Sequence, residues 1–270
     1  MQVFFIKENI EKTFFKKIFK KVELKEDSII INTLIADEKT KSKIKIVNNI
    51  KRLLDLNSVD TVIIEKRLKN DKEFMNLLYS KQIYIINGIN LYKILLGNIL
   101  KFELEKGKMK LEEISVAITL NNLNNWSENL IKKLSEKVKN LSIITNNINS
   151  FKKIQEDIYQ KLGIVVTCTN NKRKALLKAN IILNIDFPNE ILNLYTINDN
   201  ATIISIEENI KIHKKRFNGK IINNYEIKLE PNTEIDKYIN QEKYRIFDIK
   251  DIVECYITIH KDEINNITII

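Results

Sequence analysis

Short runs of branched apolar residues alternate along the chain with longer segments in which apolar residues recur every three or four positions. In the first part of the chain, apolar runs predict strands at 3–6, 29–35, 61–64 and 83–86. Helical periodicity predicts helices at 8–22, 38–56, 68–79 and 89–106. The Gly107-Lys108 break after the last of these helices predicts the end of a first domain, residues 1–107.

The same alternation is clearer in residues 108–270, which we expect to form a second domain. Apolar runs predict strands at 114–120, 141–145, 164–169, 181–185, 201–206 and 221–222 with 225–227. Helical periodicity predicts helices at 127–139, 150–162, 173–178, 188–194 and 249–259. Ser127 is the predicted N-cap of the first of these helices, and Gly163 the residue that ends the second.

Strands that are apolar throughout, with amphipathic helices between them, are typical of parallel sheets covered on both faces. The sequence therefore predicts an α/β fold with two domains, 1–107 and 108–270, each a mainly parallel sheet with flanking helices. We expect the second domain to be Rossmann-like.

The composition limits which phosphate-binding motifs the chain can contain. The chain of 270 residues has five glycines, and none are close enough to form a G-x-G-x-x-G or Walker-type loop. The formal charge of +10 comes with heavy use of Ile, Lys and Asn, which also reflects the codon bias of AT-rich genomes. Two cysteines without C-x-x-C spacing, no apolar run of membrane length and no signal-peptide pattern predict a cytoplasmic protein.

The second domain resembles the NAD(P)-binding Rossmann domain of the shikimate dehydrogenase, glutamyl-tRNA reductase and acyl-carrier-protein reductase type. The order and spacing of elements carry the resemblance over about 110 residues, 115–224, without an identity-rich motif. The matching segments are Leu141-Ser142-Ile143-Ile144-Thr145-Asn146-Asn147, Gly163-Ile164-Val165-Val166-Thr167 and Lys174-Ala175-Leu176-Leu177-Lys178-Ala179-Asn180. The resemblance implies a dinucleotide site after the first strand of this domain.

The turn at that position departs from the family. Where the family has its glycine-rich turn, this chain has Leu120-Asn121-Asn122-Leu123-Asn124-Asn125-Trp126. Asparagine tolerates the left-handed conformation, so the turn can form, but its side chain and Trp126 occupy space that a pyrophosphate needs. The candidate ligand-binding residues at this edge of the sheet are Asn121, Asn122, Asn124, Asn125, Asn146, Asn147, Lys172 and Arg173. Whether the chain binds NAD(P) stays open. Asn146-Asn147 provides neither an acidic residue for a ribose 2′-OH nor a basic residue for a 2′-phosphate.

No catalytic group is predicted. The first domain lacks the Lys and Asp motif of shikimate dehydrogenase and the nucleophilic Cys of glutamyl-tRNA reductase. Cys168 and Cys255 fall in predicted core positions. His213 and His260 have no partner at metal-ligand spacing, so no metal site is predicted.

The sequence leads to one principal hypothesis and two alternatives. The principal hypothesis is a Rossmann-like protein with a degenerate dinucleotide site that binds an anionic small molecule or a protein partner without catalysis. The first alternative is an NAD(P)-dependent oxidoreductase with an atypical asparagine-rich phosphate turn. The weaker alternative is association with nucleic acid, which no recognition helix or interleaved aromatic pattern favours. Whether the protein is an enzyme, and its oligomeric state, stay open.

Overall fold

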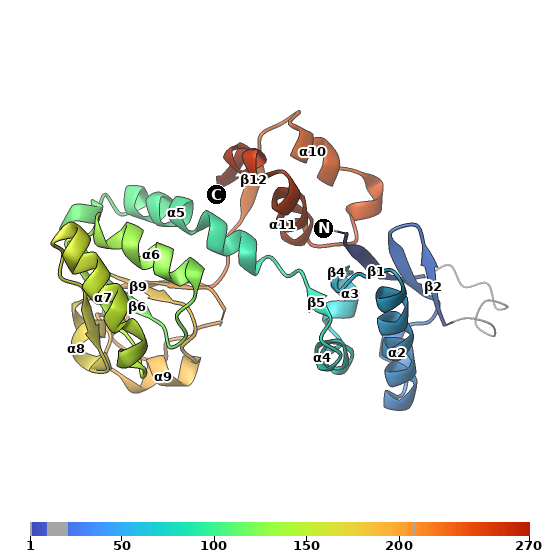
Figure 1. Cartoon of the computed structure of the whole chain (residues 1–270), viewed down its shortest axis with the longest axis horizontal. Coiled ribbons are helices and arrows are strands. Elements are labelled where there is room, and N and C mark those ends of the chain that lie inside the picture. The colour runs from blue at the N-terminus through green and yellow to red at the C-terminus, as the bar shows by residue number, and fades with distance from the viewer. Residues whose placement is uncertain (1, 10–20, 208) are drawn as a thin grey trace. The chain divides into compact units, whose positions relative to one another are not determined.

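A computed structural model describes residues 2–9, 21–207 and 209–270. The chain packs into two compact units. Unit 1 comprises Met1–Leu91 with Ile227–Thr268, and unit 2 comprises Tyr92–Glu226 with Ile269–Ile270. Both contain a mainly parallel sheet with flanking helices (Figure 1), so the predicted α/β class is confirmed.

Unit 1 is built on a sheet of order β2-β3-β1-β4-β5, in which β2 is antiparallel to β3 and the other pairs are parallel. Its strands are β1 Phe4–Glu8, β2 Val22–Lys25, β3 Ser28–Ile31, β4 Thr61–Ile64 and β5 Tyr84–Ile85. Its helices from the first part of the chain are η1 Ile35–Asp37, α2 Thr40–Leu56, α3 Lys66–Lys69 and α4 Lys72–Ser80. Most of the helix predicted over 8–22 lies outside the described residues, and its ends, Glu8 and Val22, belong to strands.

The two faces of this sheet are covered by different parts of the chain. One face packs Ile6, Val62 and Ile64 against α2 and α4. The other packs Phe5 and Ile63 against the returning C-terminal segment. That segment contains β12 Ile227–Leu229, α10 Glu234–Ile239, η3 Glu242–Tyr244, α11 Ile249–Ile259, η4 Lys261–Asn266 and β13 Ile267–Ile269. Residues 227–268 thus group with the first part of the chain, while the predicted domain limits, 1–107 and 108–270, stay a prediction.

Unit 2 is built on a six-stranded sheet of order β11-β10-β9-β6-β7-β8 whose pairs are all parallel. Its strands are β6 Ser115–Thr119, β7 Asn140–Ile144, β8 Thr167–Thr169, β9 Ile181–Asn184, β10 Thr202–Ser205 and β11 Lys220–Ile222. Numbered within the unit, this order is 3-2-1-4-5-6, the order of the doubly wound Rossmann fold. The predicted Rossmann-like topology is therefore confirmed at the level of fold.

Helices cover both faces of the second sheet (Figure 1). They are α5 Ile89–Lys106, η2 Leu111–Glu113, α6 Asn125–Ser135, α7 Ile148–Leu162, α8 Lys172–Lys178 and α9 Asn189–Leu194. Leu176 of α8 and Leu192 of α9 pack on Ala117, Ile182 and Ile203, which project from one face of the sheet. Gly163 ends α7 with φ 67°, in the left-handed conformation predicted for it.

Candidate functional site

The strand order places a topological switch point between β6 and β9 of the second sheet. From β6 the chain adds β7 and β8 on one side, then crosses back and adds β9, β10 and β11 on the other side. In open α/β sheets, ligands bind at the carboxyl ends of the two strands where the order reverses, here β6 and β9. The residues that follow these two strands are Leu120 to Asn122 and Ile185 to Asp186. The asparagine-rich turn and Asp186 therefore lie at the same switch point.

Asp186 occupies the position where the turn offers its backbone N–H groups. Its carboxylate accepts hydrogen bonds from the backbone N–H of Asn121 at 2.8 and 2.9 Å and from that of Asn122 at 3.0 Å. The side-chain amide of Asn122 lies 3.4 Å from the same carboxylate. A carboxylate of the chain itself thus accepts hydrogen bonds from the turn that follows the first strand of unit 2, where the Rossmann fold has its glycine-rich turn.

A buried polar network supports this arrangement from below. Thr119 donates to Asn184 at 2.5 Å, and the Asn184 amide donates to Ser205 at 2.9 Å and to the carbonyl of Phe187 at 3.0 Å. The side chains of Thr119, Asn184 and Ser205 are fully buried. Because these bonds fix the chain on both sides of Asp186, the carboxylate is held over the turn by the sheet itself.

The start of α6 is capped by its own residues. Asn124 accepts a hydrogen bond from the N–H of Ser127 at 3.0 Å, and the Ser127 hydroxyl accepts one from the N–H of Asn124 at 2.9 Å. This reciprocal pair is a capping box, so the predicted N-cap at Ser127 is wrong and Asn124 takes that role. No residue of the turn Leu120 to Trp126, all of which the structure describes, has a positive φ, so the turn forms without using the left-handed conformation that asparagine tolerates.

A chain of hydrogen bonds continues along the carboxyl edge. The Asn121 side chain accepts from the backbone N–H of Asn146 at 3.0 Å, and the Asn146 side chain accepts from the Lys172 ammonium at 2.6 Å. The same ammonium lies 5.8 Å from the Phe187 ring centroid and 5.6 Å from that of Tyr195. We call the four residues Asp186, Asn121, Asn146 and Lys172 the edge chain.

The eight candidate residues therefore have different positions. Asn121, Asn122, Asn146 and Lys172 are joined by hydrogen bonds to the edge chain, and Asn124 caps α6. Asn125, Asn147 and Arg173 are exposed beside it. Asp186 is the residue that sequence reasoning missed, and its signal was its place directly after a buried strand next to the strand that precedes the turn.

Unit 1 uses carboxylates at its own carboxyl edge. Glu65, which follows β4 and is 2% exposed, accepts from the backbone N–H of Glu8 at 2.8 Å. Glu8 in turn accepts from the backbone N–H of Ile35 at 2.7 Å. Burial raises the pKa of Glu8 and outweighs the hydrogen bond from Ile35, while the nearby Glu65 adds to the rise.

A buried ion pair fastens α3 to α11 in the same unit. Lys69 contacts Asp248 at 2.5 Å and also pairs with Asp251, which is 1% exposed. Burial raises the pKa of Asp251 to about 6 against the opposing attraction of Lys69. This pair joins residues 182 positions apart, and no local pattern predicts it.

The two cysteine thiols are not part of the edge chain. Burial raises the pKa of the Cys168 thiol, and it raises the pKa of the Cys255 thiol to about 11. Within residues 2–9, 21–207 and 209–270, no group of three or more His, Cys, Asp or Glu side chains is placed to hold a metal ion. None of the helices in this part of the chain has the length and apolar character to cross a membrane.

Comparison with known proteins adds little to this geometry. No family model and no curated protein matches the chain. Among solved structures, it is similar to L-tryptophan dehydrogenase from Nostoc punctiforme, with 14% identity, TM-score 0.40 and coverage of 88% of this chain and 76% of that one.

Two other similar structures belong to different enzyme classes. Hetero-hexameric glutamate dehydrogenase from Thermus thermophilus has 8% identity, TM-score 0.34 and coverage of 88% of this chain and 62% of that one. Ornithine transcarbamoylase from Giardia lamblia has 10% identity, TM-score 0.33 and coverage of 82% of this chain and 76% of that one. Likeness at this level carries no functional argument, and the Rossmann-like fold rests on the strand order of unit 2 itself.

Proposed function

We propose that unit 2 is a Rossmann-derived binding module in which Asp186 replaces the pyrophosphate of a dinucleotide. In this proposal the protein binds an anionic small molecule or a protein partner and does not take NAD(P) in the conventional pose. The hydrogen bonds from the backbone N–H groups of Asn121 and Asn122 to the Asp186 carboxylate carry the proposal.

Electrostatics explains why Asp186 and a pyrophosphate exclude each other. Both are anions that need the same N–H groups, so a bound phosphate oxygen would lie close to the carboxylate. Two unit charges about 4 Å apart repel by about 4 kcal/mol at an effective dielectric constant of about 20. That repulsion corresponds to roughly a thousandfold loss of affinity.

The rest of the edge suits a smaller anionic group. Lys172 and the exposed Arg173 lie at the other end of the edge chain from Asp186. The exposed amide of Asn146 is bonded to Lys172, and that of Asn122 lies beside Asp186. A carboxylate or phosphate that binds Lys172 and Arg173 does not need the N–H groups that Asp186 occupies. We therefore place the anionic end of the ligand at α8 and away from the turn.

The oxidoreductase alternative has one observation in its favour, the 3-2-1-4-5-6 strand order of dinucleotide-binding domains. For NAD(P) to bind in the conventional pose, Asp186 must leave the turn. The two hypotheses therefore make opposite predictions for removal of this carboxylate.

Titration calorimetry with NADH and NADPH, followed in parallel by Trp126 fluorescence, separates them. We expect no saturable binding to the wild-type protein up to about 1 mM, and a gain of at least tenfold in affinity for Asp186→Ala, since the repulsion is removed. Glu190→Ala removes an exposed carboxylate from α9 and serves as the matched control. Micromolar binding of either cofactor to the wild-type protein would overturn the proposal and favour the oxidoreductase.

A further inference from the structure

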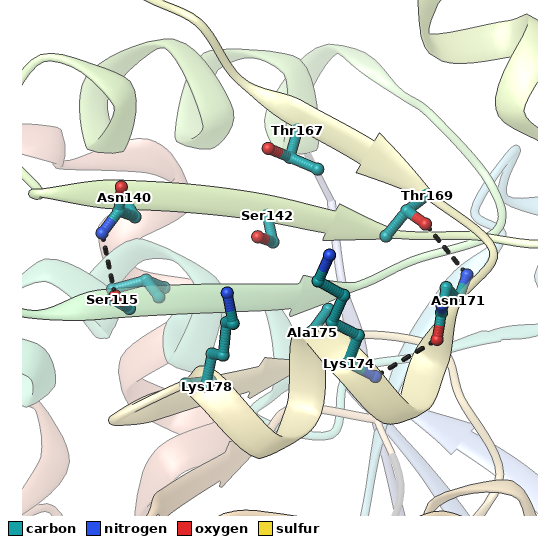
Figure 2. Close-up of a pocket in the computed structure, with 11 residues that line it drawn as sticks. Ser115, Asn140, Ser142, Thr167, Thr169, Asn171, Lys174, Ala175 and Lys178 are labelled. Atoms are coloured by element: carbon teal, nitrogen blue, oxygen red, sulfur yellow. Dashed lines mark hydrogen bonds between the residues drawn. The ribbon is translucent and has the colours of Figure 1, made fainter.

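A polar groove lies on the face of the second sheet that α8 covers, apart from the edge chain. Its volume is about 470 Å³. The floor is formed by β6, β7 and β8, and α8 forms one wall (Figure 2). The polar residues of the floor are Ser115, Asn140, Ser142, Thr167 and Thr169.

The floor is polar because of side chains that strand register brings together. Ser142 pairs with Thr167 on the neighbouring strand, and Ser115 pairs with Asn140, whose amide donates to the Ser115 hydroxyl at 3.2 Å. Strands of a parallel sheet that helices cover on both faces are normally apolar throughout. Under the apolar residues of α8 this holds, as Ala117 and Ile182 show. A second polar set on this sheet, Thr119, Asn184 and Ser205, is buried and closed by its own hydrogen bonds, whereas the polar floor on β7, β8 and the start of β6 lines an open groove.

The wall of the groove carries two ammonium groups. Lys174 and Lys178 lie one turn apart on α8, and their side chains extend toward the strands of the floor (Figure 2). No acidic residue lines the groove, and among the described residues no carboxylate forms an ion pair with either lysine. Like charges four residues apart on a helix repel each other, so an anion between them relieves that repulsion.

We propose that this groove binds a phosphate monoester of a small polyhydroxylated molecule, such as a sugar phosphate. The two ammonium groups match a phosphate monoester, which carries a charge between −1.5 and −2 near pH 7. The hydroxyls of Ser142, Thr167 and Thr169 and the Asn140 amide donate and accept hydrogen bonds, as a polyol requires. A groove of about 470 Å³ is in the range of small-molecule sites.

This site is separate from the edge chain on which the proposed function rests. The edge chain contributes none of the residues that line the groove. The inference therefore goes beyond the proposed function, and either can fail without the other. Asp186→Ala should leave binding in the groove unchanged.

Calorimetric titration with glucose 6-phosphate, inorganic phosphate and glucose tests the inference. We expect saturable sub-millimolar binding of glucose 6-phosphate, at least tenfold weaker binding of inorganic phosphate, and no binding of glucose. Lys174→Gln with Lys178→Gln should weaken glucose 6-phosphate binding at least tenfold, and Ser142→Ala should weaken it about threefold. The pair Lys152→Gln with Lys211→Gln makes the same change in charge at exposed positions outside the groove and should change it less than twofold.

Three results would overturn the inference. The first is no saturable heat with glucose 6-phosphate up to 10 mM. The second is an equal loss in the control pair, which would show that binding follows net charge only. The third is inorganic phosphate that binds as tightly as the ester, which would show that the polar floor does not contact the sugar. Thermal unfolding of each variant checks that it is folded.

Discussion

The carboxyl edges of the two sheets share one feature, a carboxylate that accepts hydrogen bonds from backbone N–H groups of a neighbouring segment. In unit 1, Glu65 accepts from the N–H of Glu8, and Glu8 accepts from that of Ile35. In unit 2, Asp186 accepts from the N–H groups of Asn121 and Asn122. Glu65 meets the last residue of β1, whereas Glu8 and Asp186 meet backbone groups that follow a neighbouring strand.

The surroundings of the two edges differ. Glu65 is 2% exposed and belongs to the packed interior, whereas Asp186 is half-buried and lies beside exposed asparagines. A buried carboxylate without its partners costs several kcal/mol, while water replaces a lost bond at an accessible edge. The difference indicates that the carboxylate of unit 1 serves the fold, and it leaves the carboxylate of unit 2 accessible for the ligand-excluding role proposed for it.

The largest expected effect on stability comes from removing the carboxylate of unit 1. Glu65→Ala leaves the N–H of Glu8 without its acceptor and opens a cavity, so we expect a loss of about 3 kcal/mol in the free energy of unfolding. Native-state hydrogen exchange of peptides from β1 and β4 measures it. Lys66→Ala, at the exposed neighbouring position, is the control and should cost less than about 0.5 kcal/mol. Equal protection in both variants would contradict a structural role for Glu65.

Asp186→Ala should destabilise unit 2 by only about 1 kcal/mol, because water reaches the two N–H groups that lose their acceptor. The single tryptophan, Trp126, lies in α6 of unit 2, so urea unfolding followed by its fluorescence reports on this unit. Asp186→Asn keeps one acceptor oxygen, so we expect a smaller loss in the free energy of unfolding of unit 2. A loss of 3 kcal/mol in Asp186→Ala would show that this carboxylate serves the fold, as Glu65 does.

The sequence predicts the elements of both units far better than the contacts between them. Apolar runs locate β4, β6, β7 and β9 within a residue or two, because burial on both faces imposes that pattern. The break between α3 and α4 was missed, since Lys72 to Ser80 continues the helical periodicity of the preceding residues and Asp71 caps a new helix. Cover for the second face of the first sheet comes from a segment more than 200 residues away from β1, which no local pattern shows.

The candidate site was predicted in part for a similar reason. The asparagine-rich turn was located by the missing glycines, and Asn146 and Lys172 by their places after the next strands. Asp186 was missed because its role depends on β9 being the neighbour of β6, a pairing of residues 65 positions apart. Strand order is a property of the whole sheet, so the closing carboxylate follows only once that order is known.

Lys172→Gln tests the far end of the edge chain and should cost about 0.5 kcal/mol in unit 2. The substitution removes the ammonium together with its contacts to the Phe187 and Tyr195 rings and its hydrogen bond to Asn146, all at an accessible edge. Arg173→Gln makes the same change in charge at an exposed neighbour and should leave the urea midpoint of Trp126 fluorescence unchanged. Equal losses in both variants would show that the chain of hydrogen bonds adds no stability.

The smallest expected effect is a pH dependence at the carboxyl edge of unit 1. Because the pKa of Glu8 is raised in the folded protein, its carboxyl holds a proton more tightly there than in the unfolded chain. Its contribution to stability is therefore present at low pH and is lost as the pH rises above the ordinary value of 4.5. Glu8→Gln keeps an acceptor for the N–H of Ile35 and removes the titration.

We expect the difference between wild type and Glu8→Gln in exchange protection of β1 to change by a few tenths of a kcal/mol between pH 4.5 and 7, since solvent screens a half-exposed group. Buried Asp251 and Glu254, whose pKa values burial also raises, contribute equally to both proteins and cancel in this difference. If the difference stays constant with pH, the hydrogen bond from Ile35 compensates the burial of Glu8. The carboxylate at the edge of unit 1 would then be held as a stable anion.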